Sequence, residues 1–168
     1  MSKRTGMGQR IAPLLRAMLQ AGSRMAFPGP VLALDVGTAK IGVAVSDAAR
    51  RMAFPVTTLQ RQSVAKDCTA LAVTVRERGV TALVVGLPER SERITHLARQ
   101  LGTALAERTG LPLHFIDEGF TSSEARLRIE EAGLLRSTVD AHAAALILEA
   151  WLAAQAEPEA VPPRPPTG

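Results

Sequence analysis

The stretch VLALDVGTAKIGVAVSD, residues 31–47, decides the fold. It contains an apolar run of strand length that ends in an acid, Val31–Asp35, and a second such run, Ile41–Ser46. The segment between them, Val36–Lys40, holds a glycine and a threonine, which are common in turns. The stretch therefore predicts two neighbouring strands joined by a tight turn, with Asp35 at the end of the first strand.

Working outward from this stretch, the chain alternates strand-like and helix-like patterns. A β-branched run, Val80–Val85, predicts a strand that is buried on both faces. The other expected elements are a weak strand near Pro55–Leu59, a helix at Ser63–Arg78, a helix at Ser91–Arg108, a strand at Leu113–Ile116 and helices at Thr121–Ala132 and Val139–Ala154.

This order of elements predicts an α/β domain with a mixed central sheet. The first three strands are expected to be antiparallel, because they follow one another as a meander. The later strands alternate with helices, which predicts parallel pairing and helices on both faces of the sheet. The order is that of the RNase H-like fold.

Composition divides the chain into three segments. Residues 1–29 form a basic N-terminal extension; Lys3, Arg4, Arg10, Arg16 and Arg24 supply its charge and no acid offsets them, so the rest of the chain carries −1 of the total +4. Residues 30–155 are expected to form the folded domain, and residues 156–168 a proline-rich, disordered tail. The extension is interpreted either as a source of phosphate contacts or as a solubilising segment. A third interpretation is that Met25 is the natural start of the protein.

The same composition excludes several classes of protein. The single cysteine, Cys68, excludes an internal disulfide and a cysteine-based zinc site, and it favours a reducing cytoplasmic location. No apolar run approaches the roughly 20 residues of a membrane span. The N-terminus lacks the long apolar core of a signal peptide.

Acids at the ends of the predicted elements are the candidates for chemistry. Asp35 closes the first strand, Asp117 and Glu118 close the last, and Asp140 lies at the start of the C-terminal helix. Ligands of open α/β sheets gather outside strand ends, so these acids are expected to converge. Converging carboxylates suit Mg²⁺ or Mn²⁺, and two such ions can clamp a phosphodiester. Asp35, Glu118 and Asp140 are thus the predicted catalytic and metal-binding residues.

Each acid also has a structural interpretation. Asp140 could close a capping box that begins at Ser137, and Glu118 could be an exposed loop acid. Asp35 is harder to explain in that way, since an acid within an apolar central strand is costly to bury unless it is paired or binds a metal.

Residues near the acids are candidates for binding substrate. Gly37 permits a tight turn whose N–H groups approach a phosphate, and Thr38 and Lys40 add a hydroxyl and a charge. Arg126 and Arg128 are expected to follow a nucleic-acid backbone. The Asp-x-Gly-Thr pattern alone also occurs in sugar kinases and actin-like ATPases.

Four motifs in order resemble the YqgF/RuvX family of RNase H-like proteins. They are residues 34–47 (LDVGTAKIGVAVSD), 85–88 (VGLP), 117–125 (DEGFTSSEA) and the Val139-Asp140-x-x-Ala-Ala-x-x-Ile-Leu pattern, and together they span residues 31 to 152. The resemblance implies a cytoplasmic bacterial nuclease, related to Holliday-junction resolvases and linked to maturation of the 16S rRNA 5′ end. The family's proposed acids match Asp35, Glu118 and Asp140.

The chain departs from the family pattern at several positions. The family usually has an arginine where this chain has Gly119, and a polar loop containing Asp-Gly where this chain has Glu89–Arg93. The lysine-rich approach to the last acid is here Arg136–Thr138. These changes affect expected phosphate contacts, so they bear on substrate preference and leave the acids unchanged.

The resulting prediction is a metal-dependent endonuclease that acts on structured RNA or branched DNA. Symmetric cutting of a four-way junction would require a homodimer, whereas processing of an RNA end would not. The alternatives are a non-catalytic module that binds nucleic acid or ribosomes, and an actin-like phosphotransferase. The second alternative generally needs two such domains, for which this chain is too short.

Overall fold

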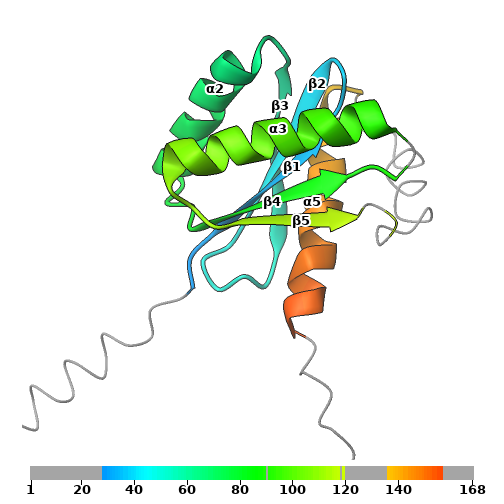
Figure 1. The fold of residues 1–168 in the computed structure, drawn as a ribbon. Coiled ribbons are helices and arrows are strands. Elements are labelled where there is room, and N and C mark those ends of the chain that lie inside the picture. The colour runs from blue at the N-terminus through cyan, green and yellow to red at the C-terminus, as the bar shows by residue number, and fades with distance from the viewer. Residues whose placement is uncertain (1–27, 90, 118, 120–135, 157–168) are drawn as a thin grey trace, which may run out of the picture.

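The computed structural model describes residues 28–89, 91–117, 119 and 136–156. In this part of the chain, one five-stranded sheet is covered by three helices (Figure 1). The strands are β1 (Val31–Val36), β2 (Lys40–Ser46), β3 (Ala53–Gln60), β4 (Ala82–Leu87) and β5 (Leu113–Asp117). The helices are α2 (Val64–Glu77), α3 (Glu92–Thr109) and α5 (Arg136–Ala156).

The sheet has the strand order β3-β2-β1-β4-β5, with β1 at its centre. Strands β1, β2 and β3 pair antiparallel, while β4 pairs parallel with both β1 and β5. The predicted mixed sheet is therefore confirmed. Because β1, β4 and β5 are parallel, their carboxyl ends meet at one edge of the sheet, and this edge carries Asp35 and Asp117.

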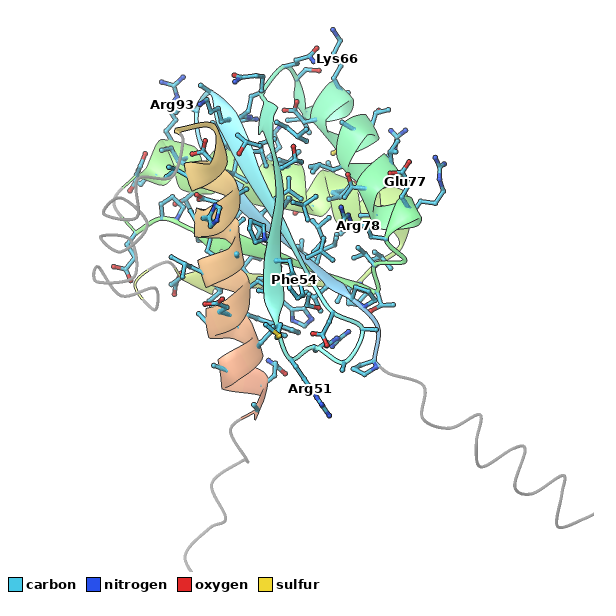
Figure 2. The ribbon with its side chains drawn as sticks, turned by 180° about the vertical axis from the view of Figure 1, so that it is seen from behind. Arg51, Phe54, Lys66, Glu77, Arg78 and Arg93 are labelled. Carbon is cyan, nitrogen blue, oxygen red and sulfur yellow. The ribbon has the colours of Figure 1, made fainter. Side chains whose placement is uncertain are left out.

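Each face of the sheet packs on different helices. On one face, Leu32 and Leu34 of β1 belong to a buried cluster that includes residues of α2 and α3. On the other face, Val31 and Ala33 pack with α5 residues such as Leu148. Figure 2 views the molecule from the opposite side to Figure 1, and in this view α5 lies in front of the second face of the sheet. Because side chains alternate along β1, its residues contribute to two separate hydrophobic clusters, one on each face of the sheet.

Several observed boundaries differ from the predicted ones; β3, for example, extends beyond the expected Pro55–Leu59 at both ends. The strand expected at Val80–Val85 is β4, which begins two residues later but is buried at every position, as predicted. The shift arises because Gly79, at φ 61°, ends the turn after α2 and the N–H of Val80 still bonds to the carbonyl of Val75. The C-terminal helix begins at Arg136 rather than Val139. The helix expected at Thr121–Ala132 lies outside the described residues.

Helix α5 lies close to the sheet because small residues line the contact. Gly42 of β2 touches the backbone of α5, so that a Cβ built on Gly42 would overlap the carbonyl group of Asp140 and lie 3.1 Å from the N atom of Ala141. Ala44 on the same strand and Ala144 of α5 belong to the same buried cluster. Glycine in a strand marks a close approach of another backbone, and here that backbone is the start of α5.

No helix in the described part of the chain is both long and apolar enough to cross a membrane.

The contact at Gly42 gives a first prediction. Gly42→Ala is expected to lower the free energy of unfolding by roughly 2 kcal/mol, because the added methyl group must displace the α5 backbone from the sheet. Chemical denaturation followed by circular dichroism measures the change. A variant as stable as the parent protein would show that α5 does not rest on Gly42.

The packing of α2 against α3 gives a second prediction. Cys68 of α2 is buried, its Sγ lies 3.9 Å from the carbonyl oxygen of Leu101 in α3, and burial raises the pKa of its thiol. Since the thiolate is the reactive form, a disulfide reagent at pH 8 is expected to modify the folded protein at least about a hundredfold more slowly than the denatured chain. Equal rates would contradict the buried position.

Candidate functional site

Asp35 and Asp140 meet at Gly42. Asp35 is the direct cross-strand partner of Gly42, so their side-chain directions share one face of the sheet. The backbone of Gly42 touches that of Asp140 on this same face. Two acids 105 positions apart in the sequence are thereby brought to one place, at the carboxyl end of the central strand. The structure therefore places the backbones of these two residues next to Gly42, one beside it in the sheet and the other above it in α5.

Lys40 lies at the same edge of the sheet and forms an ion pair with Asp140. Its ammonium Nζ lies 3.9 Å from Oδ2 of Asp140, and both side chains are about one-third exposed, at 38% and 34%. An ion pair with this much exposure contributes little to stability. Its importance is positional, because it places a cationic group against one of the candidate metal ligands.

The capping interpretation of Asp140 is wrong. A capping box would require Ser137 to precede the helix, but α5 already includes Arg136 and Ser137. Asp140 is the fifth residue of α5 as described and is not in its first turn, which contains no acid. Its carboxylate therefore does not serve the exposed N–H groups of a helix start.

The turn between β1 and β2 is tight, as predicted, and its backbone passes close enough to Gly37 to leave little room for a side chain there. The N–H of Gly37 donates to the carbonyl of Lys40 at 2.8 Å, and a Cβ on Gly37 would lie 3.1 Å from that carbonyl oxygen. Thr38 is exposed at the tip of this turn. The turn thus presents Thr38 and Lys40 beside the edge that carries Asp35.

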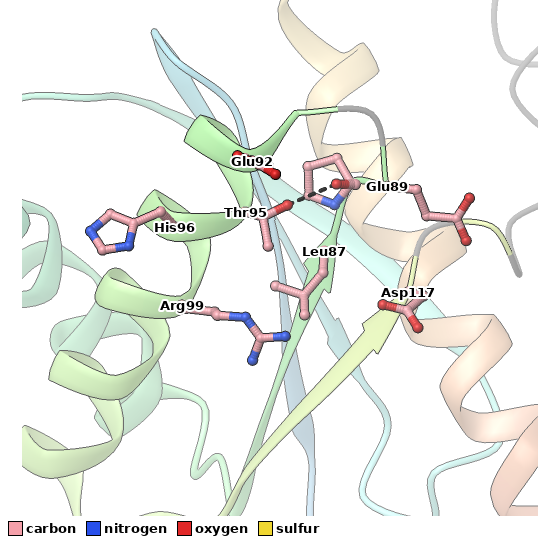
Figure 3. A pocket seen from close by; sticks show the side chains of 8 residues that line it. Leu87, Glu89, Glu92, Thr95, His96, Arg99 and Asp117 are labelled. Atoms are coloured by element: carbon pink, nitrogen blue, oxygen red, sulfur yellow. Dashed lines mark hydrogen bonds between the residues drawn. The ribbon is translucent and has the colours of Figure 1, made fainter.

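Asp117 faces the other side of the sheet. It pairs with Leu87 in the parallel register, and with Glu89, Thr95 and Arg99 it lines a cavity of about 380 Å³ next to α3 (Figure 3). Its neighbour Ile116 packs instead with the cluster on the α5 face. Asp117 is thus separated by the sheet from Asp35 and Asp140.

Three predicted site residues lie outside the described part of the chain. They are the catalytic candidate Glu118 and the substrate-binding candidates Arg126 and Arg128. They stay predictions.

The acid at the end of the 31–47 stretch has a structural role. Asp47 accepts hydrogen bonds from the backbone N–H groups of Met52, at 2.8 Å, and Arg51, at 2.7 Å. These bonds, that of Met52 foremost, hold the pKa of Asp47 below its usual range. Asp47 closes the β2–β3 turn, at the opposite end of the sheet from Asp35.

Two contributors to the site were missed by the sequence interpretation. Gly42 was noted only as part of a motif, although a glycine within an apolar strand signals the close approach of a backbone. Arg61, which follows β3, donates from Nη1 to the carbonyl of Gly37 at 3.3 Å. No local pattern around Arg61 indicates that contact, because it joins residues 24 positions apart.

The donors at this edge have the right chemistry for a hard divalent cation. Asp35 and Asp140 offer carboxylate oxygens, which Mg²⁺ and Mn²⁺ prefer. The ammonium of Lys40 lies 3.9 Å from Oδ2 of Asp140, so this carboxylate already has a cation near it. Among the described residues, no group of three His, Cys, Asp or Glu side chains forms a complete metal site.

Comparison with known proteins agrees with this geometry. Residues 29–154 match the family described as "RuvX: Holliday junction resolvase". A protein of Anaeromyxobacter sp. (strain Fw109-5), named "Putative pre-16S rRNA nuclease", is 40% identical over 129 residues, which cover 72% of this chain and 94% of the relative. A protein of the same name from Thermosynechococcus vestitus is 37% identical over 139 residues, covering 76% and 89%.

The fold is also that of a solved structure. RuvC of T. thermophilus in complex with a Holliday junction substrate superposes with a TM-score of 0.51 at 15% identity, covering 76% of this chain and 96% of RuvC. This likeness supports the RNase H-like fold. The match over most of the folded chain, the 40% identity to named nucleases and the position of Asp35 at the centre of the sheet lead to one conclusion: the chain belongs to the RuvX family of nucleases.

Proposed function

We propose that this protein is a divalent-metal-dependent endonuclease that hydrolyses phosphodiester bonds in structured nucleic acid. The observation that carries the proposal is the meeting of Asp35 and Asp140 at Gly42. Asp35 is the single acid of β1 and is its one partly exposed residue, so its carboxylate is within reach of solvent at the carboxyl end of the central strand. A second acid held beside it by a backbone contact makes a site for a cation.

The proposed ligands are Asp35, Glu118 and Asp140. Side chains alternate along β5, with Ile116 toward the α5 face and Asp117 toward the cavity near α3. Glu118, which lies outside the described residues, is included because it follows β5 directly in the sequence and matches one of the family's proposed acids. Bound Mg²⁺ or Mn²⁺ would polarise the phosphate and make a water molecule nucleophilic at neutral pH.

The chain's own side chains would orient the substrate around these acids. Thr38 would donate its hydroxyl to a phosphate oxygen, and Lys40 would contribute charge at the same turn. Lys40 lies 3.9 Å from Asp140, so it would also keep the carboxylate compensated before substrate arrives. Arg126 and Arg128 would follow the backbone of the nucleic acid.

The substrate class follows from the relatives. Their name specifies a pre-16S rRNA nuclease, the family description specifies a Holliday junction resolvase, and RuvC was solved with a junction. We propose that the chain processes the 5′ end of pre-16S rRNA, resolves four-way DNA junctions, or does both. Junction cutting would require a homodimer, which places two copies of the site on opposing strands. The lone buried cysteine accords with action in the cytoplasm.

A non-catalytic binding module is the second candidate, and the arrangement of the acids disfavours it. Carboxylates at the point where phosphate approaches would repel the nucleic acid unless a metal ion offset their charge. A pure binding module has no use for that arrangement. An actin-like phosphotransferase is disfavoured by the match of residues 29–154 to the resolvase family and by the 40% identity to a relative named as a nuclease.

Substitution of the acids tests the proposal. Asp35→Asn, Glu118→Gln and Asp140→Asn are each expected to lower the rate of Mg²⁺- or Mn²⁺-dependent cleavage by at least about a hundredfold, because each removes a charged ligand. Cleavage of a labelled precursor rRNA 5′ segment and of a four-way DNA junction is measured with each metal and with EDTA.

Asp117→Asn is the matched control. It removes the charge of the residue next to Glu118, but its side chain lies on the other face of the sheet, so the variant is expected to cleave within about twofold of the parent protein. Metal-independent cleavage, or cleavage that survives in Asp35→Asn, would sink the proposal. Binding without cleavage, unaffected by metal, would identify a binding module.

Lys40 gives a further test through salt dependence. If its ammonium contacts phosphate, Lys40→Gln is expected to reduce the slope of log Kd against log salt concentration by about 0.7 to 0.9. Fluorescence anisotropy of a non-cleavable substrate in EDTA measures the slope. Arg51→Gln makes the same change in charge at the opposite end of the molecule (Figure 2) and should leave the slope unchanged. Equal slopes for Lys40→Gln and the parent protein would remove Lys40 from the phosphate site.

A further inference from the structure

A nearly buried ion pair lies behind the β1–β2 turn. Arg61 and Asp67 have side chains that are 10% and 4% exposed, and Nε of Arg61 lies 3.5 Å from Oδ2 of Asp67. Neither of these two atoms has an aligned hydrogen-bond partner among the described residues. The attraction between them is therefore one of charge at close range. A buried pair of this kind adds little net stability, so its presence calls for another explanation.

Asp67 fixes the pair to helix α2. Its backbone N–H donates to the carbonyl of Ser63, the residue that caps α2, at 2.8 Å. Its Oδ1 accepts from the N–H of Gln62 at 3.0 Å. The carboxylate is thus held by the first turn of a helix and does not move independently of it.

Arg61 extends from Asp67 to the turn beside the active-site edge. Its backbone N–H donates to the carbonyl of Ala39 at 2.9 Å, and its Nη1 donates to the carbonyl of Gly37 at 3.3 Å. One residue therefore binds two carbonyl groups of the turn at residues 37–40. These are the carbonyls on either side of Thr38.

The direction of these carbonyls matters for a turn that meets a phosphate. A carbonyl oxygen carries partial negative charge and repels a phosphate oxygen, whereas the side chains of Thr38 and Lys40 attract it. Both carbonyls are occupied by donors of residue 61, that of Ala39 by its backbone N–H and that of Gly37 by its guanidinium. The exposed side of the turn is left to Thr38 and Lys40.

We propose that Arg61, supported by Asp67, is a positioning residue for substrate binding. It holds the β1–β2 turn so that Thr38 and Lys40 face the phosphate while the carbonyls of Gly37 and Ala39 face away from it. Its consequence for cleavage rests on the nuclease function proposed above. Its hold on the turn does not depend on that function.

The experiment compares three variants with the parent protein. The double variant Arg61→Met with Asp67→Asn removes both charges and so avoids a buried unpaired one. Arg61→Lys keeps the charge opposite Asp67 but has a single donor group in place of the guanidinium fork. Arg78→Gln removes an exposed arginine that follows α2 and serves as the control.

Two readouts are needed because a purely structural role would alter only one. Amide hydrogen exchange, read for residues 36–41 and compared with β4, reports the hold on the turn. In the double variant exchange is expected to be at least about tenfold faster at residues 36–41 and unchanged in β4. For cleavage by the double variant, KM is expected to rise about tenfold while kcat stays within about twofold of the parent protein. In Arg61→Lys, both the exchange rate at residues 36–41 and KM are expected to lie between those of the double variant and the parent protein.

The outcomes separate this proposal from the preceding one. Unchanged exchange in the double variant would overturn the anchoring role, whether or not the protein cleaves nucleic acid. Faster exchange with an unchanged KM would overturn the positioning role and leave a structural one. Failure of the parent protein to cleave would refute the nuclease function alone, and substrate affinity measured in EDTA would then replace KM as the readout.

Discussion

The contact between Gly42 and the backbone of Asp140 is the constraint on which the site depends. A residue with a side chain at this position would hold α5 away from the sheet, and Asp140 would move with it. Because Gly42 is also the cross-strand partner of Asp35, the same contact sets the separation of the two acids. The geometry of the proposed metal site is thus determined by the absence of a side chain, in a part of the sheet that is otherwise densely packed.

The two faces of the sheet have different tasks. The face covered by α2 and α3 holds the larger apolar cluster, with Leu32, Leu71 and Leu101 fully buried. The face covered by α5 is lined by smaller residues such as Ala33 and Ala44 near the site, and by Trp151 further along the helix. The face with large apolar side chains buries the most apolar surface and so contributes most to stability. The face with small side chains lets the backbone of α5 come close enough to bring Asp140 to the sheet.

Two ion pairs lie near the carboxyl end of β1, one exposed and one buried. Lys40 lies against Asp140 at the exposed edge, and Arg61 lies behind the turn with Asp67 as its buried counter-ion. The exposed pair is free to exchange partners with a phosphate or a metal ion, since its attraction is screened by water. The buried pair is screened much less and holds its geometry. The turn thus has an exposed cation, Lys40, at its front and a buried cation, Arg61, behind it.

The sequence by itself determined the order of elements, the mixed sheet and the candidate acids, because apolar periodicity and acids at element ends are local signals. It placed β4 two residues early and the start of α5 three residues late, since strand and helix ends are set by hydrogen bonds and not by hydropathy. Only the tertiary structure decided that Asp140 is not a capping residue, that Asp117 faces away from Asp35, and that Arg61 holds the turn. Each of these depends on which residues, distant in sequence, share a face of the sheet, and that is fixed by packing alone.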